Sequence, residues 1–307
     1  MERITAISYS SSANLGPGFD TLALCHDFGY DRVTVTVTGN GKSGVRIISN
    51  DTPTSPGLNS AGRAAQEFLR NFGISDSVSI EIEKGIPLSS GLGGSGSSSA
   101  ATVTALDQLY GMNLTKDEKI MLSGYGESGS IEGRHYDNVA ASILGGLVIV
   151  GSNGRIRSKR IEISPEFKFI IALPQVQSVP SKTEKMRSII PNAITREKHI
   201  MNTSSLAFLL TGFQSGDGEL IRLGMNDFIF EPERGRILGY YDAVRAAAIK
   251  SGAIGVCISG AGPSLLFVCT QEYVEKVMIG IKEKFHSLGI SCSVKEVKQG
   301  PGVRIEL

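Results

Sequence analysis

The stretch from Pro87 to Ala101, PLSSGLGGSGSSSAA, contains hardly any side-chain volume after Leu92. From Gly93 onward every residue of the stretch is glycine, serine or alanine. Glycine lets the backbone approach a ligand closely and adopt a positive φ. Free N–H groups at the start of a helix also form a concave, positively polarised site for phosphate oxygens. Because an alanine-rich segment with helical composition follows at 98–110, the stretch predicts a phosphate-binding loop that leads into a helix.

A flexible linker is the alternative that composition alone would allow. A solvated linker has no need of the apolar Leu92, and this run lies between a predicted strand at 78–83 and the predicted helix. Both features favour a phosphate loop. It is not a P-loop, because no Gly-Lys-Ser/Thr follows, and it is not a Rossmann loop, because no acidic ribose partner comes at the expected distance. A different kind of nucleotide loop is implied.

The composition indicates a folded chain that acts on small molecules. Of 307 residues, 41% are hydrophobic and 20% are charged, which allows a sizeable core. Lysine and arginine number 31 against 30 aspartates and glutamates, so we expect a small partner, with no nucleic acid and no membrane. The four cysteines form no CxxC pair, which argues against a zinc knuckle or a disulfide framework. No stretch resembles a signal peptide or a membrane helix, and the expected location is cytoplasmic.

Hydrophobic periodicity predicts alternating strands and helices. The predicted strands are 33–38, 78–83, 142–150, 167–173, 254–258 and 265–269. The predicted helices are 59–73, 98–110, 116–126, 240–250 and 272–288. The chain is longer than a usual single domain, and a glycine-containing turn at 151–154 precedes a fresh strand-like run. These features predict two domains, 1–155 and 156–307.

Three glycine-rich motifs occur in order along the chain. They are SANLGPGFD from Ser12, the phosphate-loop stretch from Pro87, and SGAGPS from Ser259. Together they resemble the motifs of the GHMP small-molecule kinases, and the first resembles that of the homoserine kinases within this family. In the loop, Gly94 stands where the family usually has a first serine, and Gly96 replaces an alanine. The resemblance spans nearly the whole chain. It implies an α+β fold with an N-terminal domain similar to the second domain of ribosomal protein S5, a ferredoxin-like C-terminal domain, and a site between them.

The resemblance implies ATP and Mg²⁺ as cofactors. The residues that it assigns to nucleotide binding are Asn59, Pro87, Ser90, Gly91, Leu92, Gly93, Gly94, Ser95, Gly96, Ser97 and Ser98. Lys84 is also expected to approach the nucleotide, because it directly precedes Gly85-Ile-Pro87. At Asn59, capping of the predicted helix is the simpler interpretation. Ser95 and Glu127 would hold the metal. Glu127 lies eight positions before His135 and eleven before Asn138, a spacing similar to that of the family's metal-binding glutamate, and is preferred to Glu132.

The resemblance also implies a pocket for L-homoserine, a zwitterion that needs a cation for its carboxylate and an acceptor for its ammonium. The expected substrate shell is Asn14, Asp20, His135, Asn138, Thr183, Arg187 and Arg234. In it, the two arginines would bind the carboxylate, and Asp20 the amino group or the hydroxyl. His26, His199 and His286 match no motif and are assigned no role.

Asn138 is one of two expected catalytic residues, with Glu127. Mevalonate kinase and galactokinase carry an aspartate, as candidate base, where this chain has Asn138. An asparagine cannot accept a proton at neutral pH. The resemblance therefore implies a mechanism without a side-chain base at this position, as in the homoserine kinases, which share the His-x-Asp-Asn pattern.

The activity implied by the resemblance is ATP-dependent phosphorylation of the side-chain hydroxyl of L-homoserine, a step of threonine biosynthesis. Another GHMP kinase, such as a mevalonate kinase, is the nearest alternative. A non-catalytic sensor that binds the amino acid or the nucleotide without turnover is an alternative of another class. The retained Ser95 and Glu127 argue against it, because a sensor has no need of both metal ligands. The sequence leaves the oligomeric state open, a homodimer included.

Overall fold

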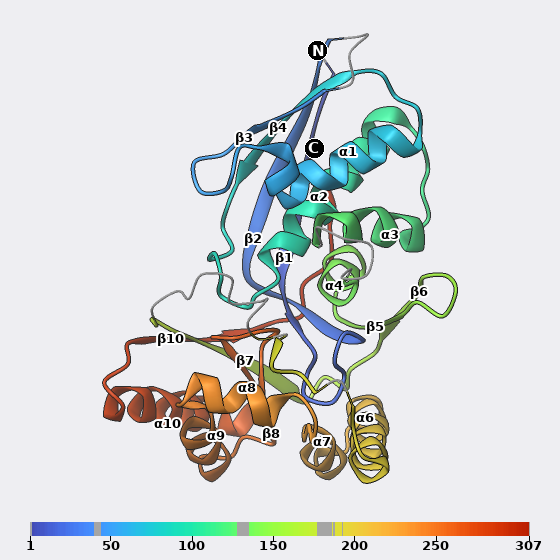
Figure 1. The fold of residues 1–307 in the computed structure, drawn as a ribbon. Coiled ribbons are helices and arrows are strands. Elements are labelled where there is room, and N and C mark those ends of the chain that lie inside the picture. Colours follow the sequence, from blue (N-terminus) through green and yellow to red (C-terminus); the bar gives the residue numbers. More distant parts are fainter. Residues whose placement is uncertain are drawn as a thin grey trace.

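The protein folds around two β-sheets, each covered by helices, in a computed structural model that describes residues 2–39, 44–127, 135–176, 186, 188–191 and 193–306 (Figure 1). The α+β fold class inferred from the three motifs is confirmed by this arrangement. Within the described residues, no helix is long and apolar enough to cross a membrane.

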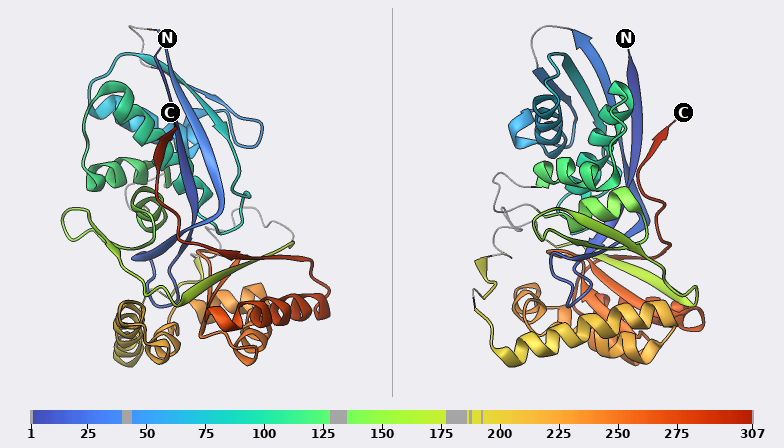
Figure 2. Two further views of the ribbon diagram at one scale, coloured as in Figure 1. Left: turned by 180° about the vertical axis from the view of Figure 1, so that it is seen from behind. Right: turned by 90° about the vertical axis from the view of Figure 1, so that its right-hand side faces the viewer.

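Among the described residues, the first sheet has seven strands in the order β11-β1-β2-β4-β3, with β5 paired to β2 and β6 paired to β5. Its pairs are antiparallel except for β3 with β4. The strands are β1 (Arg3–Ala13), β2 (Leu22–Gly39), β3 (Gly44–Ile48), β4 (Ser77–Glu83), β5 (Leu147–Gly151), β6 (Arg157–Ile161) and β11 (Arg304–Glu306). One face of this sheet carries α1 (Ser60–Asn71), α2 (Gly94–Tyr110), α3 (Lys116–Glu127) and α4 (Asp137–Leu144), as the side view in Figure 2 shows. A short 3₁₀ turn, Pro56–Leu58, precedes α1.

The second sheet is antiparallel, in the order β10-β7-β9-β8. Its strands are β7 (Phe167–Pro174), β8 (Gly255–Ile258), β9 (Leu265–Thr270) and β10 (Cys292–Val297). The helices of this half are α6 (Arg196–Ser215), α7 (Gly218–Gly224), α8 (Glu231–Leu238), α9 (Tyr241–Lys250) and α10 (Val274–Ser287), the last preceded by a 3₁₀ turn at Gln271–Tyr273. Leu24 and Leu147 of the first sheet share a core cluster with Phe169, Leu266 and Phe213 of this half. The two halves are therefore joined by a continuous apolar core.

Helix α2 lies at the centre of the first half, against α1, α3, α4, β1 and β2. Its serines and alanines from Ser97 to Ala101 are all buried. A helix with neighbours on every side must be apolar or small all round. The lack of side-chain volume that marks this stretch therefore also serves the packing of α2 from Ser97 onward.

Most predicted elements are confirmed, and two predictions were wrong in part. The helix predicted from residue 98 begins at Gly94, so the end of the glycine-serine run is its first turn. The strand predicted over 142–150 is the end of α4 followed by β5, with Gly145 and Gly146 at positive φ between them. A buried helix end and a buried strand are both apolar, so periodicity cannot separate them.

The predicted boundary near residue 155 does not separate the two sheets. Strand β6 pairs with β5, and β11 pairs with β1 through Thr5 and Glu306, so segments from beyond residue 155 belong to the first sheet. Short strands at sheet edges, such as the three residues of β11, carry little periodicity of their own. Their place depends on contacts that are distant in sequence.

Candidate active site

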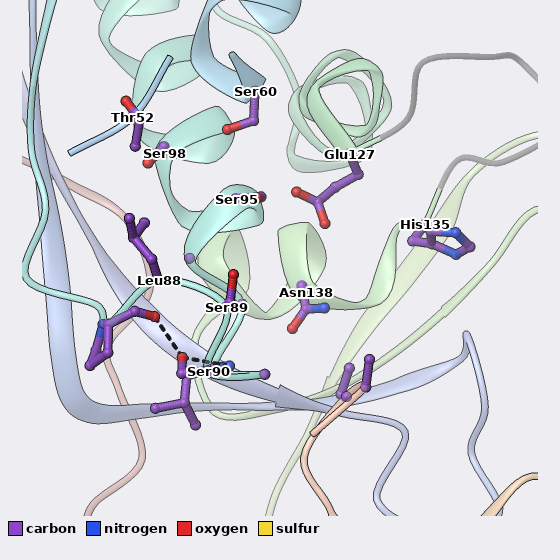
Figure 3. A pocket seen from close by; sticks show the side chains of 18 of the residues that line it. Thr52, Ser60, Leu88, Ser89, Ser90, Ser95, Ser98, Glu127, His135 and Asn138 are labelled. Atoms are coloured by element: carbon purple, nitrogen blue, oxygen red, sulfur yellow. Dashed lines mark hydrogen bonds between the residues drawn. The ribbon is translucent and has the colours of Figure 1, made fainter. Parts of the chain in front are cut away.

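A cavity of about 850 Å³ lies where the two halves meet, and it is lined by all three glycine-rich motifs (Figure 3). Sixteen residues expected in the site line it: Asn14, Asp20, Asn59, Lys84, Pro87, Ser90, Gly91, Leu92, Gly93, Gly94, Ser95, Ser98, Glu127, His135, Asn138 and Arg234. Thr183, Arg187 and Glu132 lie outside the described residues. Two further expected residues, Gly96 and Ser97, are not among those that line the cavity.

The phosphate-loop backbone turns into α2 through two glycines at positive φ. Gly91 has a φ of 79° and Gly93, the residue before α2, has a φ of 68°. A Cβ on Gly93 would meet the side chains of Ser11 and Asn138, so this position requires glycine. Within the described structure no side chain caps α2, and the N–H groups of its first turn have no carbonyl inside the helix. They form a site suited to phosphate oxygens.

The carbonyl groups of this loop are held by the protein. The Ser264 N–H donates to Ser90 O at 3.2 Å, Ser259 Oγ donates to Gly91 O at 2.7 Å, and the Ser11 N–H donates to Leu92 O at 3.0 Å. Three successive acceptors are thereby occupied. A negatively charged ligand therefore meets N–H groups in this loop rather than carbonyl oxygens.

Gly96 and Ser97 face the protein instead of the cavity. The Ser97 hydroxyl donates to Ser8 O at 2.9 Å, and its N–H bonds Gly93 O at 2.9 Å. A Cβ on Gly96 would lie 3.1 Å from Asn138 Cβ, so this glycine lets α2 approach α4. Once the chain is helical, successive residues point to different sides with a period of 3.6 residues. The prediction treated the loop as one continuous run of binding residues and did not take this period into account.

Lys84 lines the cavity, but its charge is already paired. Its ammonium forms a buried ion pair with Asp31 and donates to Gly94 O at 2.9 Å and Ser98 Oγ at 3.1 Å. Asp31 also accepts from Ser98 Oγ at 2.9 Å and from the N–H of Ile86 at 3.2 Å. Lys84 thus ties β4 to the first turn of α2. All three ammonium hydrogens have protein partners.

Asn59 caps α1, as expected. Its side-chain oxygen accepts from the N–H groups of Ala61 at 3.0 Å and Gly62 at 3.3 Å. Its amide nitrogen donates to Thr52 Oγ1 and to the carbonyl of Pro53. This side chain therefore joins the start of α1 to Thr52 and Pro53, which also line the cavity.

Glu127 ends α3, and its carboxylate lies beside Ser95 and Asn138 in Figure 3. Its Oε1 is buried and has no hydrogen-bond partner among the described residues. Burial, and secondarily the charge of Asp137, raise the pKa of Glu127 to about 7. No cluster of three histidine, cysteine or acidic side chains suited to a metal ion occurs in the described part of the chain. A metal here would take this carboxylate, a hydroxyl and ligands from the substrate, as Mg²⁺ does in kinases.

The far end of the cavity carries the charged groups expected for an amino acid. His135 Nδ1 lies 3.1 Å from Asp20 Oδ1. Asn14 Nδ2 and Arg234 Nη1 both donate to Gly260 O, at 3.1 and 3.0 Å. The loop that carries Asn14 and Asp20 has both residues at positive φ, 77° and 55°. Strained residues of this kind persist where the surrounding structure holds them, often at ligand sites.

Asn138 is held from the side of the first sheet. Ser11 Oγ donates to its Oδ1 at 2.8 Å. The amide oxygen is thus engaged, which leaves the amide nitrogen, a donor, as the group to meet a ligand. A donor at this position orients a substrate oxygen and removes no proton from it.

Several residues that line the cavity were not predicted from the sequence. Asp137 lies beside the predicted Asn138 and is 2% exposed, and Phe19 stacks on Phe230 with ring centroids 3.9 Å apart. Arg234 lies over the Phe19 ring, 5.1 Å from its centroid. Phe19 belongs to the first motif, and its position there was the available signal. Other unexpected lining residues come from outside the motifs: Asp51, Thr52, Pro53, Leu58, Ser60, Arg63 and Ile82. Nothing in their local sequence marks them, because the fold alone brings them to the cavity.

Comparison with known proteins places this geometry in a family. Residues 59–146 match the N-terminal domain of the GHMP kinases, and residues 209–287 match the GHMP kinase C-terminal domain. The chain is 42% identical over 302 residues to a homoserine kinase of Thermoplasma volcanium, covering 98% of this chain and 96% of that protein. It is 38% identical over 308 residues to a homoserine kinase of Saccharolobus solfataricus, covering 100% and 99%.

Solved structures show the same fold. The crystal structure of a homoserine kinase from Cytophaga hutchinsonii superposes with a TM-score of 0.90 at 28% identity, covering 100% of this chain and 98% of that one. The mevalonate kinase of L. major gives a TM-score of 0.65 at 17% identity, covering 96% and 95%, and shares the fold. The chain belongs to the GHMP kinases, and within them to the homoserine kinases.

Proposed function

We propose that this kinase transfers the γ-phosphoryl group of ATP to the side-chain hydroxyl of L-homoserine, forming O-phospho-L-homoserine for threonine biosynthesis. One observation carries the proposal: a single cavity has the uncapped start of α2 at one end and Asp20, His135 and Arg234 at the other. The first end suits a polyphosphate, and the second offers both charges that a zwitterion requires. The homoserine kinase relatives support the choice of acceptor.

Mg²⁺ is the metal that this site fits, on the evidence of the buried and unpartnered Oε1 of Glu127. A carboxylate and the Ser95 hydroxyl are oxygen donors of the kind that Mg²⁺ prefers. When bound, the ion would neutralise charge on the phosphate groups. Glu127 and Ser95 would hold it. The α2 amides would bind the phosphate oxygens.

The acceptor hydroxyl is aligned by groups of this chain. Asn138 can donate to the hydroxyl oxygen, whose lone pair attacks the γ-phosphorus while the bond to the β–γ bridging oxygen breaks and ADP leaves. Since Asn138 cannot take the proton, we propose that the hydroxyl proton passes to an oxygen of the transferred phosphoryl group. Positioning and charge stabilisation account for most catalysis in phosphoryl transfer, so the lack of a strong base at this position is compatible with turnover.

A coupled ADP-release assay tests the proposal with homoserine, threonine, serine and mevalonate, each with and without Mg²⁺. We expect turnover with homoserine and Mg²⁺, and mass spectrometry should identify the phosphorylated product. Preferential turnover of mevalonate would reassign the acceptor. Binding of homoserine and ATP without ADP release would contradict a catalytic function and favour a sensor.

A further inference from the structure

Glu231, the first residue of α8, is only 7% exposed and lies one turn before Arg234. Glutamates are seldom buried to this degree unless a partner compensates them. Here Oε1 accepts from the N–H of Ile258, and Oε2 accepts from the Tyr241 hydroxyl at 2.8 Å. Both donors are uncharged. The carboxylate therefore serves in these two contacts as a hydrogen-bond acceptor and not as a counter-ion.

These contacts lie along the open edge of β8. The strand pairs with β9 on one side, and in the described part of the chain no strand pairs with its other side. Backbone groups of an edge strand have no ladder partner on that side. The Ile258 N–H meets Glu231 there, and Val256 O lies 3.4 Å from the Tyr241 hydroxyl. Glu231 and Tyr241 thus bind backbone groups that this edge would otherwise leave unpaired.

Strand β8 leads directly into the third motif, where the chain meets α8 a second time. Gly260, two residues after Ile258, accepts from Arg234 Nη1 at 3.0 Å and from Asn14 Nδ2 at 3.1 Å. Helix α8 is therefore joined to one short segment twice, by Glu231 to Ile258 and by Arg234 to Gly260. Two contacts fix the orientation of the helix against the segment, whereas one contact would let it pivot.

The segment after β8 is held independently of α8. The Ser259 N–H donates to Ser264 O at 2.9 Å, which continues the pairing with β9 beyond Ile258. In contrast, three of the eight residues of α8 are buried, Glu231 among them. Loss of the contact between Glu231 and Ile258 should therefore move α8, while Ser259 keeps its place beside the phosphate loop.

We propose that Glu231 is a positioning residue that fixes α8 against β8 and thereby orients the Arg234 guanidinium toward the carboxylate of the amino-acid substrate. The identity of that substrate rests on the proposed function. A guanidinium binds a carboxylate through a planar fork, so its orientation matters as much as its charge. The Phe19 ring, 5.1 Å from Arg234 Cζ, supports the guanidinium on one side but cannot set the position of the helix that carries it.

Glu231→Met keeps much of the side-chain length but removes both acceptor oxygens. We expect KM for homoserine to rise about 5- to 30-fold, the equivalent of one or two buried hydrogen bonds, and KM for ATP to stay within about twofold. Glu231→Gln keeps an oxygen that can accept from the Ile258 N–H, and it should restore most of the homoserine affinity. Glu233→Met, the same change at a half-buried residue of α8 that pairs with exposed Arg236, is the matched control.

A double-mutant cycle shows whether Glu231 acts through Arg234. Arg234→Lys keeps the charge but loses the planar fork, and it should weaken homoserine binding. Adding Glu231→Met to this variant should cause little further loss, because the fork that Glu231 orients is already absent. Fully additive losses would overturn the proposal. Equal rises of both KM values, or a glutamine variant no better than the methionine variant, would reduce Glu231 to a general structural role and overturn it as well.

Two readouts on ligand-free, ¹⁵N-labelled protein do not depend on turnover. The Ile258 amide should be protected from hydrogen exchange in the parent and in Glu231→Gln, and should exchange faster in Glu231→Met. The side-chain N–H signal of Arg234 should shift in the methionine variant alone. Unchanged exchange and an unchanged Arg234 signal in Glu231→Met would contradict the proposal.

The same readouts separate this proposal from the proposed function. If they behave as expected but the parent neither binds nor phosphorylates homoserine, the proposed function fails while the positioning of Arg234 by Glu231 stands. Calorimetry measures homoserine binding directly, and thermal unfolding shows that each variant is folded.

Discussion

The Glu127 carboxylate combines burial with an oxygen that the described protein leaves unsatisfied. If it holds Mg²⁺, Glu127→Gln keeps the shape but loses the charge. We expect kcat to fall about 100-fold or more, as for removal of one strong electrostatic contact in an active site, and half-maximal activity to require more Mg²⁺. Turnover titrated with Mg²⁺ checks this, with the exposed Glu219→Gln as control. An unchanged Mg²⁺ dependence would remove Glu127 from the metal site.

Lys84 contributes to stability, because its side chain is only 5% exposed and the side chain of its partner Asp31 is fully buried. Lys84→Met leaves that carboxylate without its cation, and we expect the free energy of unfolding to fall by about 3–5 kcal/mol. Urea denaturation measures the loss. Arg222→Ala breaks the exposed pair with Glu219 and should leave the urea midpoint nearly unchanged. Similar midpoints for both variants would show that the buried pair contributes little.

The approach of helix α2 to helix α4 depends on Gly96. A Cβ there would lie 3.1 Å from Asn138 Cβ and 3.2 Å from the Val139 backbone nitrogen. Because backbone cannot yield cheaply, Gly96→Ala should cost about 1–3 kcal/mol of stability and raise KM for homoserine by displacing Asn138. Denaturation and steady-state kinetics measure the two effects.

Gly94→Ala, two residues earlier at the first position of α2, is the matched control. Its Cβ would lie 3.2 Å from Lys84 Nζ, a side-chain atom rather than backbone, and alanine is a better helix former than glycine. We therefore expect this variant to keep nearly the parent stability. If both alanine variants behaved alike, the close approach of the two helices would not explain the glycine at 96.

The elements that sequence predicted well are those with a strong local pattern. VTVTVT in β2 and the Asn59 start of α1 carry their own periodicity and cap. The start of α2 was misplaced by four residues because glycine and serine are poor helix formers, and tertiary packing overrides that preference here. The three motifs all contribute residues to the cavity lining, although the lining residues of the third motif were not assigned to the site in advance. The contacts of Ser11 with Asn138 and of Ser259 with Ser12 join residues more than a hundred positions apart, which no local pattern encodes.

The stability of the folded protein should depend on pH through Glu231. Burial and the nearby Asp227 raise the pKa of this carboxyl from 4.5 to about 8. The folded protein then holds a proton that the unfolded chain releases. The resulting stabilisation is complete below about pH 4.5 and is lost as the pH rises through about 8. One titrating group can change the free energy of unfolding by at most about 1.4 kcal/mol per pH unit.

Glu231→Gln resembles the protonated acid and should remove this slope. We expect the variant to be more stable than the parent at pH 8.5, by a margin that shrinks toward pH 5. Urea denaturation at several pH values measures it, with the exposed Glu283→Gln on α10 as control. A margin that is constant across this range would contradict the raised pKa of Glu231.

The pairing of β11 with β1 has a consequence for how the chain matures. Proteins emerge from the ribosome amino end first, so β1 is made early but gains its outer neighbour only after Arg304–Glu306 have left the exit tunnel. The chain must therefore be synthesised through Glu306 before β1 has both of its neighbours in the sheet. Nascent chains stalled before this point should consequently retain nucleotide less well than full-length ones.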